Sequence, residues 1–154
     1  MSFLKRILGV KSSTNTCLIN VKLSLYKNVK PYYHVENYAL FINNKRNRSL
    51  LTRLRAGCQD IEIEVGRWRG IPRDQRVCKL CNDGIETEMH FLLYCTNLYH
   101  IRISFNRLFT DLYNCNSDTE RFILMFTKEF IRETARFIRH IYDERKKILY
   151  KQWL

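Results

Sequence analysis

Four potential metal ligands lie within one stretch of 18 residues, and they constrain the possible folds of this chain more than any other feature of the sequence. They follow the spacing Cys78-x2-Cys81-x8-His90-x4-Cys95, and four sulfur and nitrogen donors suit the tetrahedral sites that Zn²⁺ prefers. One tight turn can present the first two thiolates, and residues 82–84 supply turn residues directly after it. Four protein ligands would close the coordination sphere, so the spacing predicts a structural zinc site.

The second pair of ligands is predicted to come from a short helix that begins near Thr87 or Glu88. At about 100° per residue, His90 and Cys95 are roughly 140° apart around a straight helix, so we expect Cys95 at a frayed helix end. The alternative is a chance grouping of buried thiols with a core histidine. The remaining cysteines are expected to be ordinary buried thiols, and the remaining histidines surface or core residues: Cys17, Cys58, Cys115, His34, His100 and His140.

The chain is strongly basic, with 27 Lys and Arg against 15 Asp and Glu and a net charge of +12. This excess favours polyanionic partners, RNA or DNA, although a well-hydrated surface would also account for it. Positive charge gathers just before the cysteines. The candidate nucleic-acid-binding residues are therefore Arg67, Arg69, Arg73, Arg76 and Lys79.

Several classes of protein are not expected. The first apolar run is too short for a secretory signal peptide, so we expect an intracellular protein, nuclear or cytoplasmic, with reduced thiols. No stretch approaches the roughly 18 apolar residues of a membrane span. The sequence has no adjacent pair of aspartates and no Gly-rich phosphate-binding motif with its lysine, so we expect no enzymatic activity.

Periodicity predicts a mainly α fold with a small β hairpin at the zinc site. A short helix from Ser49 is expected to end at Gly57. Ile61, Ile63 and Val65 alternate with glutamates, which predicts a half-buried strand.

Long helices are predicted after the last ligand. An apolar stripe over 98–112 predicts one helix, and the capping-box pair Ser117 and Glu120 predicts the start of a long C-terminal helix with an apolar face over 123–141. We expect that face to pack within the chain rather than on a partner or a second copy. Its cations are placed largely off that face: Arg132, Arg136, Arg139, Arg145, Lys146 and Lys147. The predicted organisation is a connector-like basic segment (1–47), a zinc-stapled CCHC module (48–115) and a basic C-terminal helix (116–154).

The segment RLRAGCQDIEIEVGRWRGIPRDQRVCKLCNDGIETEMHFLLYC resembles the zinc-binding region that follows the reverse transcriptase in LINE-type, jockey-like non-LTR retrotransposon polyproteins. The start, FLKRILGVKSST, is similar to the stretch before that region, so the likeness covers residues 3 to about 14 and about 48 to 112. The polymerase and endonuclease domains of such polyproteins are not in this sequence. The resemblance implies the same four ligands and a module that helps a reverse transcriptase, supplied by another chain, engage nucleic acid.

The preferred hypothesis is a non-catalytic nucleic-acid-binding module in which the arginines contact phosphates. Trp68 could stack on an unpaired base. Alternation along the predicted strand would instead place it on the opposite face from Arg67 and Arg69, which favours a core anchor. The alternatives are a protein-interaction module that uses the apolar helices, and an element fragment without a selected role.

Overall fold

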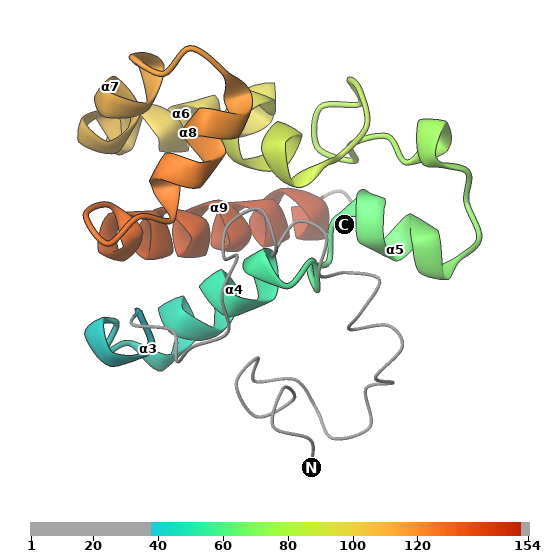
Figure 1. Ribbon diagram of the computed structural model, residues 1–154. Coiled ribbons are helices and arrows are strands. Elements are labelled where there is room, and N and C mark those ends of the chain that lie inside the picture. Colours follow the sequence, from blue (N-terminus) through green and yellow to red (C-terminus); the bar gives the residue numbers. More distant parts are fainter. Residues whose placement is uncertain (1–37, 152–154) are drawn as a thin grey trace.

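The computed structural model describes residues 38–151, in which helices joined by short loops make up almost all of the regular structure (Figure 1). The predicted mainly α fold is therefore confirmed. Residues 3–14, which carry part of the family resemblance, lie outside the described residues, as does most of the predicted connector segment. The elements are α3 (Tyr38–Phe41), α4 (Lys45–Arg55), α5 (Glu62–Trp68), η1 (Arg73–Gln75), η2 (His90–Tyr94), η3 (Thr96–Leu98), α6 (Tyr99–Ser104), α7 (Asn106–Tyr113), α8 (Asp118–Met125) and α9 (Ile131–Lys151).

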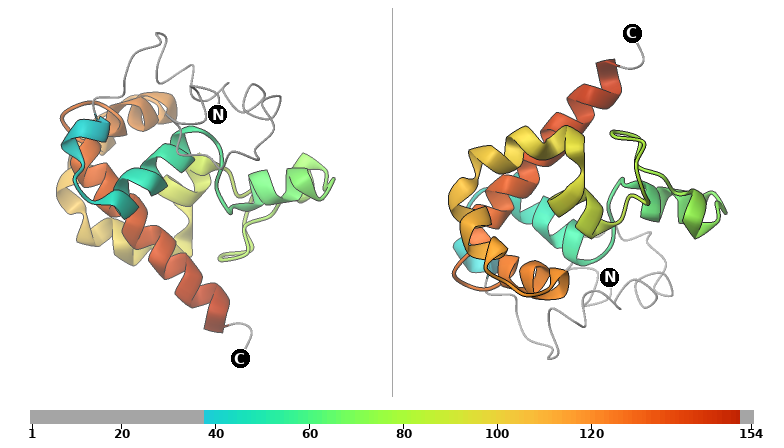
Figure 2. Two further views of the ribbon diagram at one scale, coloured as in Figure 1. Left: turned by 90° about the horizontal axis from the view of Figure 1, so that it is seen from below. Right: turned by 90° about the horizontal axis from the view of Figure 1, so that it is seen from above.

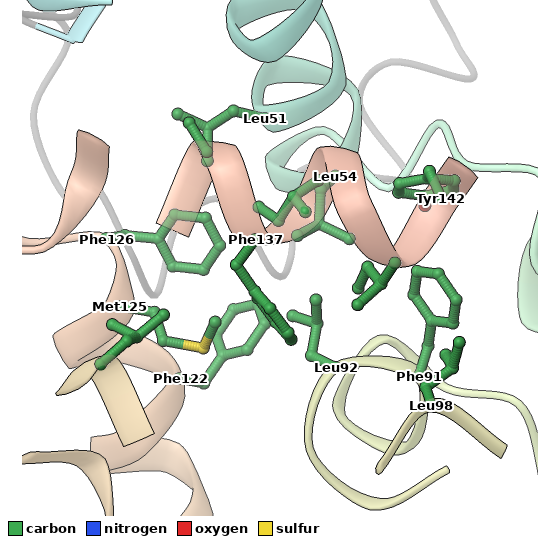
Figure 3. Packing of buried hydrophobic residues seen from close by; sticks show 14 of the residues in the cluster. Leu51, Leu54, Phe91, Leu92, Leu98, Phe122, Met125, Phe126, Phe137 and Tyr142 are labelled. Carbon is green, nitrogen blue, oxygen red and sulfur yellow. The ribbon is translucent and has the colours of Figure 1, made fainter. Parts of the chain in front are cut away.

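Helix α9 is the central element. It packs most extensively on α4 and lies between that helix and the layer formed by α6, α7 and α8 (Figure 1). Leu51 and Leu54 of α4 lie on one side of the buried Phe137, and Leu92 and Phe122 lie on the other (Figure 3). Each such side chain contributes about 1.5–3 kcal/mol when it is removed from water. Most of the predicted apolar face of the C-terminal region is thus packed within the chain, as expected, but Ile123 is exposed.

Helix α4 ends at Arg55, and Gly57, with φ of 59°, terminates it as the sequence predicts, but the helix begins at Lys45 rather than at Ser49. The part of the predicted connector segment that is described, residues 38–47, packs on α9 through α3 and the start of α4. Tyr38 and Ile42 are buried there, and Arg46 forms an ion pair with Asp143 of α9. These residues therefore belong to the helical body.

The predicted strand at 61–65 is wrong, because this segment opens α5. Ile61 is extended and precedes the helix, and Glu62 and Glu64 occupy its first turn, where acidic side chains are favourable. The isoleucines are buried as predicted, but both glutamates are buried as well. The alternation therefore did not separate a core face from a solvent face.

The predicted β hairpin is likewise not formed. Residues 38–151 contain no β-strand, and a single antiparallel bridge pairs Val77 with Ile85 across the cysteine turn. The hydrogen bonds from the Cys78 N–H to the Gly84 carbonyl and from the Glu86 N–H to the Arg76 carbonyl flank this bridge. The pairing does not extend into strands because η1 ends just before it and the chain is helical again from Glu88.

Two helices predicted as continuous are each divided in two. Phe105 leaves the helical conformation and separates α6 from α7, which lets its ring meet the edge of Phe137 at 5.5 Å between centroids. A turn after Phe126 separates α8 from α9, and the Thr127 hydroxyl there donates to the Leu124 carbonyl. These breaks let short helices follow the surface of α9, which one straight helix could not do.

Replacing Ser117 with alanine should lower the free energy of unfolding by about 1 kcal/mol. The Ser117 hydroxyl accepts from the Glu120 N–H at 3.2 Å, and the Glu120 carboxylate accepts from the Ser117 N–H at 3.3 Å, so the predicted capping box is confirmed. Urea denaturation measures the change. The matched control is Ser49→Ala, at an exposed position inside α4, which should be neutral or slightly stabilising. Equal losses in both variants would contradict the capping role.

Candidate metal centre

The four predicted ligands come together in one cluster. The ligand atoms of Cys78, Cys81, His90 and Cys95 all lie within 4.8 Å of one another. The Sγ atoms of Cys78 and Cys95 are 3.8 Å apart, and Cys81 Sγ lies 3.3 Å from His90 Nε2. Cys78 and Cys95 are fully buried, whereas Cys81 and His90 are partly exposed. A Cys3His cluster of this size could hold one metal ion.

A tight loop presents the first two thiols. The Asn82 N–H donates to the Cys78 carbonyl at 2.8 Å, and the Cys78 N–H donates to the Gly84 carbonyl at 3.0 Å. Both Asn82 (φ 55°) and Gly84 (φ 68°) are in the left-handed region, which asparagine tolerates and glycine adopts at no steric cost. The turn residues after Cys81 therefore have the role that the sequence predicts.

A π-helical turn presents the other two ligands. The Cys95 N–H donates to the His90 carbonyl at 2.7 Å, five residues back, and the Thr87 hydroxyl accepts from the His90 N–H. This turn is wider than an α-helical turn, so Cys95 returns to the same side as His90. Cys95 itself is outside the helical conformation, which confirms the expected helix end. Phe91 and Leu92, between the ligands, are fully buried and anchor the cluster to the core.

A buried carboxylate ties the cluster to the rest of the fold. Glu86 is completely buried and accepts from the Arg145 guanidinium at 2.9 and 3.2 Å and from the Glu62 N–H at 2.6 Å. One of its oxygens lies 3.7 Å from Cys78 Sγ. Glu86 thus links the cysteine loop, the start of α5 and helix α9. Sequence reasoning gave Glu86 no role and placed Arg145 off the buried face, which is wrong.

A buried arginine lies at the cluster, and burial and hydrogen bonding shift the pKa values of the groups there. The buried Arg102 donates to the Cys95 carbonyl, and burial lowers its pKa while the nearby Cys95 opposes that shift. Burial lowers the pKa of His90, which favours the neutral imidazole that can coordinate a metal. The hydrogen bond between Cys78 and Cys95 raises the pKa of the first thiol and lowers that of the second. Arg102 is a positive charge at the cluster that sequence reasoning missed.

The remaining cysteines and histidines take no part in the cluster. Cys58 and Cys115 are partly buried, so the expectation of buried thiols is only partly met. His100 and His140 are exposed, on α6 and α9. Cys17 and His34 lie outside the described residues.

The predicted nucleic-acid-binding residues lie mainly on a projection that we call the basic arm, residues 61–77. Helix α5 and the chain that follows it extend to one side of the helical body before returning to the cluster (Figure 2). The side chains of Arg69 and Arg73 are exposed and form no hydrogen bond or ion pair within the described part of the chain. Arg67 pairs with Glu64 at 3.1 Å. Lys79, just beyond the arm, pairs with Glu62 at 2.6 Å.

Arg76 differs from the other four cations because it holds the arm together. Its guanidinium donates to the Ile71 carbonyl at 2.9 Å and to the Ile63 carbonyl at 3.0 Å. Its aliphatic stem lies on Gly66, where an added Cβ would stand 2.7 Å from Arg76 Cγ. The half-buried Arg76 is therefore engaged within the protein.

Trp68 is not the core anchor that the predicted strand favoured. It is the last residue of α5, and its side chain is 58% exposed at the outer end of the helix. The expectation failed because it assumed alternating strand faces, and the segment is helical.

Comparison of the chain with protein-family models, with curated proteins and with solved structures found no match. None of the helices in residues 38–151 combines the length and the apolar character that crossing a bilayer requires. The candidate functional features of this part of the chain are the Cys3His cluster, the buried pair of Glu86 and Arg145, and the basic arm.

Proposed function

We propose that this chain is a zinc-dependent, non-catalytic nucleic-acid-binding module of the kind that follows the reverse transcriptase in LINE-type retrotransposon polyproteins. The observation that carries the proposal is the position of the Cys3His cluster at the base of an arm with exposed cations. The ligand motif that resembles that family supports the same function. In this proposal the polymerase is supplied by another chain.

Zinc is the metal that the cluster fits best. Tetrahedral coordination with Zn–S bonds of about 2.3 Å and Zn–N bonds of about 2.0 Å gives ligand separations of about 3.8 Å for two sulfurs and about 3.5 Å for sulfur and nitrogen. The Cys78–Cys95 and Cys81–His90 separations are 3.8 and 3.3 Å. Four protein ligands leave no coordination position for a reactive water, so the proposed role of the ion is structural. It would fix the cysteine loop to η2 and thereby hold the base of the arm.

Nucleic acid is the proposed partner because the chain carries a net charge of +12 and exposes Arg69 and Arg73 at the outer part of the arm. Guanidinium groups bind phosphate oxygens without regard to base sequence. Binding of this kind releases counterions, so the affinity should fall steeply as salt rises.

The test is fluorescence anisotropy with labelled oligonucleotides over about 50 to 200 mM salt. Replacing both Arg69 and Arg73 with glutamine should weaken binding and reduce the slope of log K against log salt by about 2, one for each lost phosphate contact. The matched control removes two charges from exposed positions of α9, as Arg136→Gln with Lys146→Gln, and should leave the slope nearly unchanged. Negligible binding by the wild type at the lowest salt would refute the proposed function.

A further inference from the structure

The arm presents an aromatic surface as well as charge, and on the basis of the proposed function we infer that it binds unpaired, single-stranded nucleotides, with Trp68 stacking on a base. Both RNA and single-stranded DNA offer this chemistry. The proposal thus adds a substrate class, and a base-contacting residue, to the phosphate contacts of Arg69 and Arg73.

The position of Trp68 leaves room for a ligand. Trp68 ends α5, and Gly70 turns the chain away with φ of 70°. Apart from Gly70 and its two neighbours in the chain, no atom lies within 4 Å of the place that a Cβ on Gly70 would occupy, so the space beside the turn is open. Trp68 is 58% exposed, so much of the surface of its indole is accessible to a ligand.

Charge directs phosphates to the same end of the arm. The exposed residues of 67–75 include three arginines and a single acid, Asp74. Arg67 is held by Glu64, a buried acid on the inner side of the arm, whereas Arg69 follows the indole directly and Arg73 lies on η1. Arg69, next to the indole in the chain, is therefore the cation best placed to meet a phosphate beside the stacked base, and Arg73 would add positive charge on the segment that follows.

Stacking on an indole favours single strands over duplexes. Every base offers a flat face to an aromatic ring, but in a duplex both faces of each internal base are already stacked on its neighbours. Two exposed arginines would also neutralise few phosphates, so charge alone would hold a duplex weakly. Binding at this arm should thus depend on Trp68 for single strands and show little dependence on it for duplexes.

The test uses the full chain loaded with zinc. Three labelled probes are compared: oligo(dT), oligo(U) and a blunt DNA duplex. Each probe has about 20 nucleotides, which is longer than a single-strand binding site of this size requires. At least one of the strands should bind more tightly than the duplex, and the two strands distinguish DNA from RNA. Trp68→Ala should weaken strand binding roughly 5- to 100-fold, and Trp68→Phe should retain most of it. Tyr99→Ala is the matched control, because Tyr99 on α6 is also 58% exposed, and it should change nothing.

Intrinsic fluorescence supplies a second measurement that does not need a disruptive variant. Binding of a single-stranded oligonucleotide should quench the tryptophan fluorescence of the wild-type protein. The Trp68→Phe variant, which retains only Trp153, should show no comparable quenching. Equal binding of strands and duplex, with no effect of Trp68→Ala and no quenching, would overturn this inference and leave the proposed function standing. A wild type that binds none of the probes at low salt would overturn both.

Discussion

Replacing Cys78 with serine is expected to abolish zinc binding and to unfold the cysteine loop and the basic arm. The wild type should hold one zinc ion per chain, and both Cys78→Ser and His90→Ala should hold none, because each removes a donor from a cluster whose ligand atoms lie within 4.8 Å of one another. In zinc-finger peptides the metal contributes about 10–16 kcal/mol to folding at neutral pH, so the loss should be large. Elemental analysis gives the stoichiometry, and circular dichroism follows the unfolding when a chelator is added.

The unfolding should be partial. Helix α4 packs directly on α9 through Leu51 and Leu54, so this half of the core should persist, whereas Phe91 and Leu92, between the ligands, should loosen from the other side of α9. The arm has no comparable core of its own, so trypsin should cut it at Arg69 and Arg73 faster after chelation. The control is Cys115→Ser, a partly buried cysteine outside the cluster, which should keep the metal and the protease resistance. A folded wild type without zinc would refute the metal site.

The ligands were predictable because the information is local. A turn of a few residues places Cys78 and Cys81 together, and the following helix supplies His90, so the spacing alone determines most of the geometry. The position of Cys95 at a helix end was also predictable, because a straight helix could not direct both His90 and Cys95 at one ion. The π-helical turn that solves this problem was not predictable, because no residue pattern in the segment distinguishes it from an α-helical end.

The prediction of a strand at 61–65 was wrong for a reason that lies partly outside this segment. Its glutamates are buried because Glu62 pairs with Lys79, 17 residues away, and Glu64 pairs with Arg67 on the next helical turn. Local alternation assumes that polar residues face solvent, and paired charges violate that assumption. Trp68 was then assigned to the wrong environment as a consequence.

The pairing of Glu86 with Arg145 joins residues that are 59 positions apart, and no local pattern could identify the partner. A signal for Arg145 did exist. It follows Ile138 by seven residues and Ile141 by four, so helical periodicity places it on the buried face of α9. A charged residue on such a face implies a buried partner, and Glu86 is that partner.

Replacing Glu86 with glutamine should lower the free energy of unfolding of the zinc-loaded protein by about 3–5 kcal/mol, because it leaves the Arg145 guanidinium buried without its counter-charge. The side chains of Arg145 and Glu86 are 8% and 0% exposed, so water cannot replace the lost partner. Glutamine keeps the size of the side chain and an oxygen that can accept from the Glu62 N–H, so the change isolates the charge. Urea denaturation at saturating zinc measures the loss.

A double-mutant cycle tests whether the loss comes from this pair. Adding Arg145→Met to Glu86→Gln should restore much of the stability, because an apolar side chain of similar length removes the uncompensated charge. The control is Glu144→Gln, which breaks the pair with Lys147, a residue whose side chain is 68% exposed, and it should cost less than about 1 kcal/mol. If Glu86→Gln costs no more than Glu144→Gln, the buried pair does not hold α9 to the metal cluster. A restored double mutant would show instead that the loss in Glu86→Gln comes from the Arg145 charge that is left without a partner.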